Sequence, residues 1–150
     1  MAEGFLKSII TNDEYLSKIY ITASVGISAN MGDCACRYAI GALKTGWGID
    51  ISGHCVSRLH KEDIEASFLI LTMTRSLKEY ILSTFSVSNR KVFTLNEYAY
   101  KKSLHPEYLQ CDYSPDISDP YGMTLQVYNQ CAIEIKQAID KLVEKLKNKN

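Results

Sequence analysis

The residues best suited to proton transfer stand at Asp119-Pro120-Tyr121, directly before the longest amphipathic stretch of the chain. Pro120 fixes its own φ angle and holds Asp119 extended, so the carboxyl group is carried on a stiff turn. A carboxyl group in this position can donate a proton into a cleft, or it can cap the helix that follows. Taken alone, these residues favour the cap, because Asp is a preferred residue at helix starts.

Cysteines are the other candidates for chemistry, and the chain has five of them. Their odd number and irregular spacing do not indicate a disulfide framework. The Cys34-x-Cys36 pair is a weak sign of a metal site, because zinc sites use a longer spacing and a second pair. We therefore expect free thiols in a reduced, cytoplasmic protein, with no metal and no cofactor.

The net charge and the distribution of apolar and basic residues argue against several classes of protein and partner. Lys and Arg together number 17, as do Asp and Glu, so the net charge is zero and a broad nucleic-acid-binding surface is not expected. No run of 18 apolar residues is present, which argues against a membrane span. The first ten residues lack the basic leader of a signal peptide.

The elements that must position these residues alternate between helix and strand. Apolar residues predict a helix from the first residue to Ile10 and another from Gly32-Asp33 to about Thr45. The other expected elements are strands over Lys18–Ile27, Phe68–Thr72 and Lys91–Leu95, and helices over Lys61–Ala66, from Thr74 or Ser76 onward, and after Gly122. For the helix near Thr74, Ser76-x-x-Glu79 suggests a capping box. The last helix is expected to carry one apolar face, made of Tyr128, Cys131, Ala132, Ile135, Ala138, Ile139, Leu142, Val143 and Leu146. Residues 101–118 read as a long loop. This order predicts one α/β domain over residues 1–150, a three-layer fold with a parallel sheet and helices on both faces.

With these elements in order, the chain resembles the low-molecular-weight protein tyrosine phosphatases. The segments that carry the resemblance are Met1-Ala-Glu-Gly-Phe-Leu6, Ser24-Val-Gly26, Gly48-Ile-Asp50, His54, Lys61-Glu-Asp63, Phe68–Thr74, Lys91–Tyr98 and Asp116–Gly122. Each segment is weak alone, but together they run in the family's order through nearly all 150 residues. The segment over 91–98 is similar to the bacterial members, some of which act on phosphoarginine instead of phosphotyrosine.

The resemblance implies a specific chemistry. In the family, the Cys of a Cys-x5-Arg-Ser loop attacks phosphorus, while backbone amides, a helix N-terminus and the Arg hold the phosphoryl oxygens. The Asp of an Asp-Pro-Tyr loop protonates the leaving group and then activates the water that hydrolyses the phosphocysteine. The resemblance therefore implies a phosphorylated protein or an aryl phosphate as substrate, and binding of phosphate or sulfate ions.

Site residues carry over by position. Asp119 matches the general acid and Tyr121 the aromatic residue that lines the substrate slot. Ser24 matches a serine that supports the phosphate loop, and His54 a histidine behind that loop. The structural alternatives are a helix cap for Asp119, core packing for Tyr121 and turn roles for Ser24 and His54.

The nucleophile loop has no match in this sequence. No cysteine is followed six positions later by arginine, and the chain begins at the Met-Ala-Glu that ends the family motif. We therefore expect a domain that lacks its first and central strand, that is inactive as given and that is unstable alone. The alternatives are a non-catalytic interaction module that keeps the fold and, less favoured, another open-sheet enzyme. Oligomeric state, including a homodimer, is left open.

Overall fold

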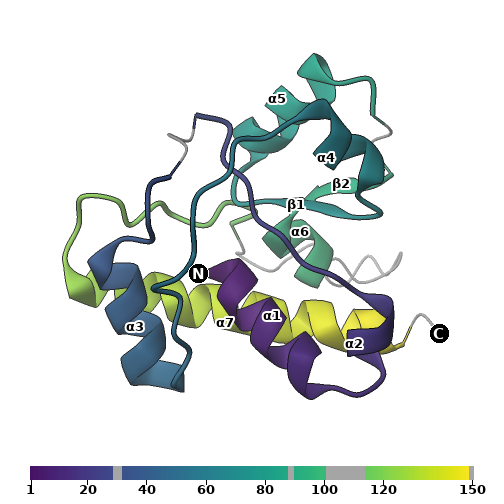
Figure 1. The fold of residues 1–150 in the computed structure, drawn as a ribbon. Coiled ribbons are helices and arrows are strands. Elements are labelled where there is room, and N and C mark those ends of the chain that lie inside the picture. Colours follow the sequence, from purple (N-terminus) through teal and green to yellow (C-terminus); the bar gives the residue numbers. More distant parts are fainter. Residues whose placement is uncertain (29–31, 88–89, 101–113, 149–150) are drawn as a thin grey trace.

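The computed structural model describes residues 1–28, 32–87, 90–100 and 114–148 (Figure 1). Its elements are α1 (Ala2–Asn12), α2 (Leu16–Ile19), α3 (Arg37–Trp47), α4 (Lys61–Ala66), β1 (Ile70–Thr72), α5 (Arg75–Thr84), β2 (Val92–Thr94), α6 (Leu95–Tyr100) and α7 (Leu125–Lys147). Within these residues, no helix is both long and apolar enough to cross a membrane.

Helices cover both faces of a small parallel sheet. β1 and β2 pair in parallel, with Ile70 opposite Val92 and Thr72 opposite Thr94. Neighbouring side chains of a strand point to opposite faces, and here Ile70 packs against one core cluster while Leu71 packs against the other. Figure 1 shows α4 and α5 on one side of the strands and α6 and α7 on the other. The predicted α/β fold with a parallel sheet between helices is confirmed.

The larger core is organised by one face of α7. Nine residues of this helix are buried at the spacing that an amphipathic helix requires, and α1, α3 and α6 all pack against it. These residues are Tyr128, Cys131, Ala132, Ile135, Ala138, Ile139, Leu142, Val143 and Leu146. Phe5 of α1 and Leu43 of α3 are fully buried in the same cluster. The sequence predicted this face of α7 correctly.

The smaller core lies on the other side of the sheet and consists of Ile64, Ile81 and Val92. Lys91 closes it at one end, because its Nζ donates to the carbonyl oxygens of Ile64 at 2.6 Å and Ser67 at 2.8 Å. These carbonyls belong to the last turn of α4 and the residue that follows it, where helix carbonyls have no partner within the helix. The ammonium group thus joins the end of α4 to the start of β2.

The strand expected over Lys18–Ile27 is wrong. Leu16–Ile19 forms a single helical turn, and the extended residues after it make only an isolated parallel bridge, between Gly26 and Arg58. A strand is stabilised by the neighbour that it pairs with, and this segment has no ladder partner among the described residues. Ile21 is accordingly 99% exposed.

Several predicted element ends also need correction. The other two strands are shorter than expected, and α3 is preceded by Cys36 instead of Gly32-Asp33. Of the two predicted caps of α5, Thr74 is confirmed, because its hydroxyl accepts a hydrogen bond from the Leu77 amide at 3.3 Å, and the capping box from Ser76 is wrong, because Ser76 lies inside the helix. The short helix α6 was not predicted. Most of the long loop expected over 101–118 lies outside the described residues.

Candidate functional site

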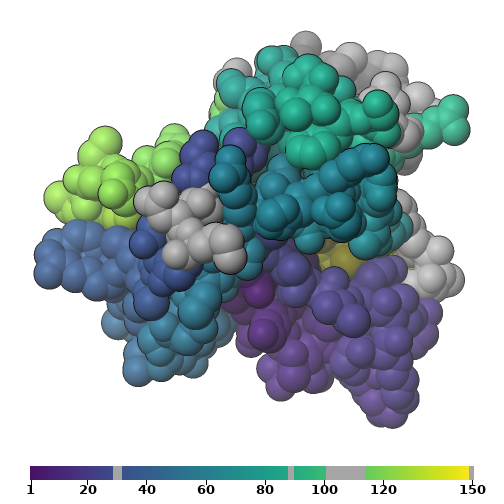
Figure 2. All heavy atoms as spheres, turned by 45° about the horizontal axis from the view of Figure 1, so that its top comes forward, coloured from purple at the N-terminus to yellow at the C-terminus, as the bar shows by residue number. Residues whose placement is uncertain are grey.

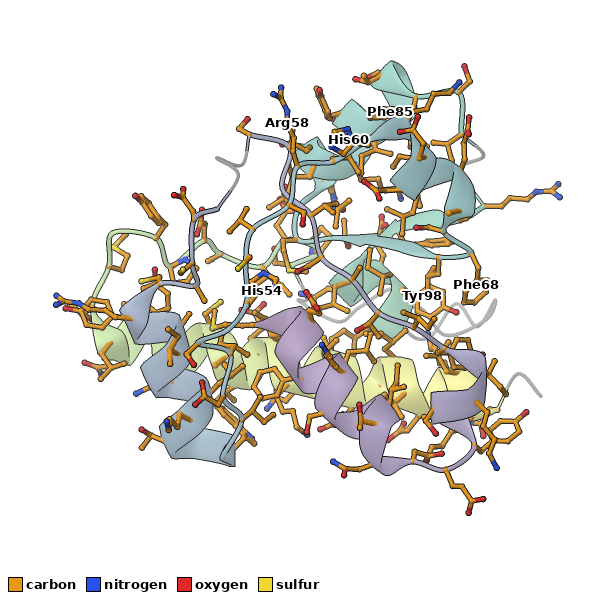
Figure 3. All side chains as sticks on the ribbon, viewed as in Figure 1. His54, Arg58, His60, Phe68, Phe85 and Tyr98 are labelled. Carbon is orange, nitrogen blue, oxygen red and sulfur yellow. The ribbon has the colours of Figure 1, made fainter. Side chains whose placement is uncertain are left out.

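Three segments far apart in the sequence meet at the first turn of α1. The Ser24 hydroxyl donates a hydrogen bond to Oε2 of Glu3, and Nδ1 of His54 lies 3.5 Å from the same oxygen. Figure 3 shows His54 on its extended segment beside the start of α1. The glutamate therefore brings together two of the residues that the sequence singled out, Ser24 and His54.

Two extended segments carry these side chains to α1. Residues 20–28 and 49–60 run past each other in front of the helices, as Figure 1 shows. Gly26 donates to the carbonyl of Ser57 at 2.8 Å, and its own carbonyl accepts from the Leu59 amide at 3.0 Å. These two bonds hold the segments together without a continuous ladder. The contacts of Ser24 and His54 with Glu3 then attach both segments to the first turn of α1.

Asp119 lies on a turn that precedes α7 without capping it. Its Oδ1 accepts a hydrogen bond from the Tyr121 amide at 3.0 Å, and the residue before the first turn of α7 is Thr124. The side chain of Asp119 is exposed while Pro120 is buried, so the proline anchors a turn that presents the carboxyl group to solvent. The helix-cap alternative for Asp119 is therefore wrong.

Tyr121 projects from the same turn and is 81% exposed, which excludes core packing as its role. Asp119 and Tyr121 both act electrostatically on the buried Tyr128, although they are minor causes of its shift. A hydrogen bond to the Cys36 sulfur is the main cause that raises the pKa of Tyr128 to about 12, followed by burial. The turn thus lies within electrostatic reach of the pair formed by the Tyr128 hydroxyl of α7 and the Cys36 thiol before α3.

Cys131 of α7 connects the Asp119 turn with the start of α1. Its thiol donates to the Ser118 carbonyl at 3.5 Å, and burial is the main cause that raises its pKa to about 11. The Asp119 carboxylate adds to this rise and the amino group of Met1 opposes it, so both charges lie within electrostatic reach of the same sulfur. Asp119 and the amino end of α1 therefore both lie near Cys131.

Sequence reasoning missed the contacts that three residues make in this region: Glu3, Cys36 and Tyr128. Glu3 stands in the first turn of α1, where an acidic residue is explained by the helix dipole alone. Tyr128 was assigned to the core face of α7, and only its hydroxyl group reveals the contact with Cys36. Within the described ranges, no group of three or more His, Cys, Asp or Glu side chains is arranged to hold a metal ion.

Comparisons with known proteins decide the family. The sequence model of the low-molecular-weight phosphotyrosine protein phosphatases matches residues 1–150. This chain belongs to that family. A protein-arginine-phosphatase of Bacillus subtilis is 30% identical over 148 residues, which cover 98% of this chain and 87% of the relative.

Solved structures of the family have the same fold. The low-molecular-weight protein tyrosine phosphatase of T. tengcongensis aligns with a TM-score of 0.79 at 35% identity, covering 96% of this chain and 88% of that one. The arginine phosphatase of Geobacillus stearothermophilus aligns with a TM-score of 0.81 at 28% identity, covering 99% and 84%. The relatives thus include proteins named for each of the two phosphorylated residues.

Proposed function

We propose that these 150 residues form the acid side of a protein phosphatase site, with Asp119 as the general acid and base. The observation that carries the proposal is the exposed Asp119 carboxyl group on its own turn, which acts on the same Cys131 sulfur as the amino group at the start of α1. A helix N-terminus attracts a phosphoryl group through its free amides and its dipole. A carboxylic acid near that end can protonate the departing oxygen or nitrogen.

Tyr121 is proposed to line the substrate slot. Its ring projects into solvent next to Asp119, where an aromatic leaving group would have to lie during proton transfer. Ser24 and His54 are proposed to act indirectly, by holding Glu3 and so the first turn of α1 in place. They would set the position of a phosphate loop that joins α1 at this end.

The proposed reaction needs a cysteine nucleophile and a phosphate-binding arginine. In the family these form a Cys-x5-Arg loop, and this sequence contains no cysteine and arginine at that spacing. We therefore propose that the 150 residues alone do not hydrolyse phosphoesters. They would do so when joined to a segment that carries a strand and a Cys-x5-Arg-Ser-Pro loop. The cysteinyl-phosphate intermediate would form on that loop, and Asp119 would then activate the hydrolytic water.

Hydrolysis of two aryl phosphates by the joined protein tests this role for Asp119. Phenolate is a poor leaving group that needs a proton, whereas p-nitrophenolate leaves easily without one. We expect Asp119→Asn to lower kcat/KM for phenyl phosphate by about 10²–10⁴-fold and for p-nitrophenyl phosphate by much less, because kcat/KM reports the departure of the leaving group and not the later hydrolysis of the cysteinyl phosphate. Asp140→Asn, on the exposed side of α7, should leave both rates unchanged. Equal losses on the two substrates would show that Asp119 is not the acid.

A phosphorylated protein is the proposed substrate, in the cytoplasm. The relatives are named as arginine phosphatases and tyrosine phosphatases, so phosphoarginine and phosphotyrosine peptides are the two substrates to compare. The second candidate function is a non-catalytic module that retains the fold, favoured by the lack of a Cys-x5-Arg pair. It predicts that the joined protein is as inactive as the 150 residues while binding a partner protein saturably.

A further inference from the structure

Two exposed cysteines face each other on neighbouring segments beside this site. Cys34 and Cys55 form an isolated antiparallel bridge, and both are free thiols at the surface. They come from the segment that leads into α3 and from the segment that carries His54. Nothing in the proposed phosphatase reaction uses either sulfur.

The backbone hydrogen bond beside the bridge shows whether Cys34 and Cys55 are a hydrogen-bonded or a non-hydrogen-bonded antiparallel pair. The Val56 amide donates to the carbonyl of Asp33 at 2.9 Å, so the bond joins the residues that flank the two cysteines. Cys34 and Cys55 are therefore a non-hydrogen-bonded pair, in which the Cα atoms lie about 4.5 Å apart and the side chains are close. This separation falls within the Cα range of about 4.4–6.8 Å found in disulfides.

We propose that Cys34 and Cys55 are a reversible disulfide site that closes on exposure to hydrogen peroxide. One thiol ionises and its thiolate attacks a peroxide oxygen, so the O–O bond breaks and a sulfenic acid is formed, while the departing hydroxide takes up the thiol's proton as water. The second thiol ionises and its thiolate attacks that sulfur, so the S–S bond forms and the S–O bond breaks, and the departing hydroxide takes up the second thiol's proton to give a second water. Peroxide thereby takes up the two electrons that the two thiols lose, and a dithiol reopens the bridge.

The bridge would hold His54 in position without touching it. Successive side chains of an extended segment point to opposite sides, so Cys55 faces Cys34 while His54 faces Glu3. Closing the bridge fixes a loop of about 20 residues that includes all of α3. We therefore expect oxidation to stabilise the protein and to keep the contact between His54 and Glu3.

Peptide mapping of the full chain tests the proposal. After reduction, removal of the reductant and treatment with peroxide, unreduced tryptic digestion should release residues 19–37 linked to residues 45–58. Residues 19–37 contain both Cys34 and Cys36, so single Cys→Ser variants are needed to show which of the two forms the disulfide with Cys55. We expect Cys34→Ser and Cys55→Ser each to lower the linked peptide at least tenfold, and Cys36→Ser to leave it unchanged.

A thermal melt gives a second readout. The oxidised protein should melt about 5–10 °C higher than the reduced protein, and the difference should vanish in Cys34→Ser. Failure of the linked peptide to form, its persistence in Cys34→Ser, or its formation only between differently isotope-labelled molecules would each overturn the proposal. Both readouts are independent of phosphatase activity, so their failure is distinct from a failure of the proposed function.

Discussion

Tyr128 and Cys36 share a hydrogen bond that shifts their pKa values in opposite directions. The Tyr128 hydroxyl group is the main cause that lowers the pKa of the Cys36 thiol, and backbone amides at the start of α3 add to the effect. The same bond raises the pKa of Tyr128. An exposed thiol of lowered pKa carries more thiolate at neutral pH, and the thiolate is the reactive form.

Alkylation rates measure this pair directly. Tyr128→Phe removes the donor and keeps the ring, so the pKa of Cys36 should rise and its alkylation by iodoacetamide at pH 7 should slow by several-fold. The two proteins should converge at high pH, where the thiol is ionised in both. Cys55, quantified in the same digests, is the internal control and should not change. A Tyr128→Phe protein that reacts at the wild-type rate at pH 7 would contradict the assignment.

At the residue scale, the sequence singled out Asp119, Tyr121, Ser24 and His54 through family resemblance, and their proposed roles stay predictions. Glu3 could not be found in this way because its partners are about 20 and 50 positions away, and residue type alone does not report such distant contacts. Tyr128 was placed correctly on the buried face of α7, but helical periodicity says nothing about where its hydroxyl group points.

Among the elements, α5 shows how a helix start is chosen between two candidates. Thr74 precedes the helix and its hydroxyl accepts the Leu77 amide, whereas Ser76 already lies inside the helix. We expect Thr74→Ala to lower the free energy of unfolding by about 1 kcal/mol and Ser76→Ala to change it by less than about 0.5 kcal/mol. Urea denaturation of the two variants beside the wild type measures both values. The reverse order would show that Ser76 provides the cap.

A genuine capping box was present in the sequence at another position. The Glu97 amide donates to Thr94 Oγ1 at 3.0 Å and the Thr94 amide donates to Glu97 Oε2 at 2.9 Å, which is the reciprocal pattern of a box. The helix α6 that it starts was missed because its first residue, Leu95, also continues the apolar run of β2. Periodicity does not separate two short elements when one follows the other with no turn between them.

The failed strand over Lys18–Ile27 has a different cause. Alternating β-branched residues such as Ile19 and Ile21 predict an extended backbone, and the backbone becomes extended at Tyr20, although Ile19 itself is the last residue of α2. Strand formation also requires a hydrogen-bonding neighbour, and a local pattern cannot show whether one is available. By contrast, α7 needed no such information, because its backbone hydrogen bonds, apart from those at its ends, form within the helix.

Across the whole molecule, stability should depend most on the core that α7 organises. Leu142 is 1% exposed within this core, and Leu125 on the same helix is 43% exposed. We expect Leu142→Ala to reduce the free energy of unfolding by about 2–5 kcal/mol, because it removes buried contacts and leaves a cavity. Leu125→Ala should cost less than about 1 kcal/mol. Equilibrium unfolding by denaturant compares the two, and similar losses would mean that the core lies elsewhere.

The ammonium group of Lys91 gives the smaller core an unusual dependence on a single charge. It donates to carbonyl groups at the end of α4 and lies next to Val92, a member of the cluster beneath that helix. Acetylation would neutralise the nitrogen and reduce its N–H donors from three to one. The nitrogen could then no longer donate to both carbonyl groups at once. The arrangement makes Lys91 a point at which a single covalent change would loosen one face of the sheet and leave the α7 core intact.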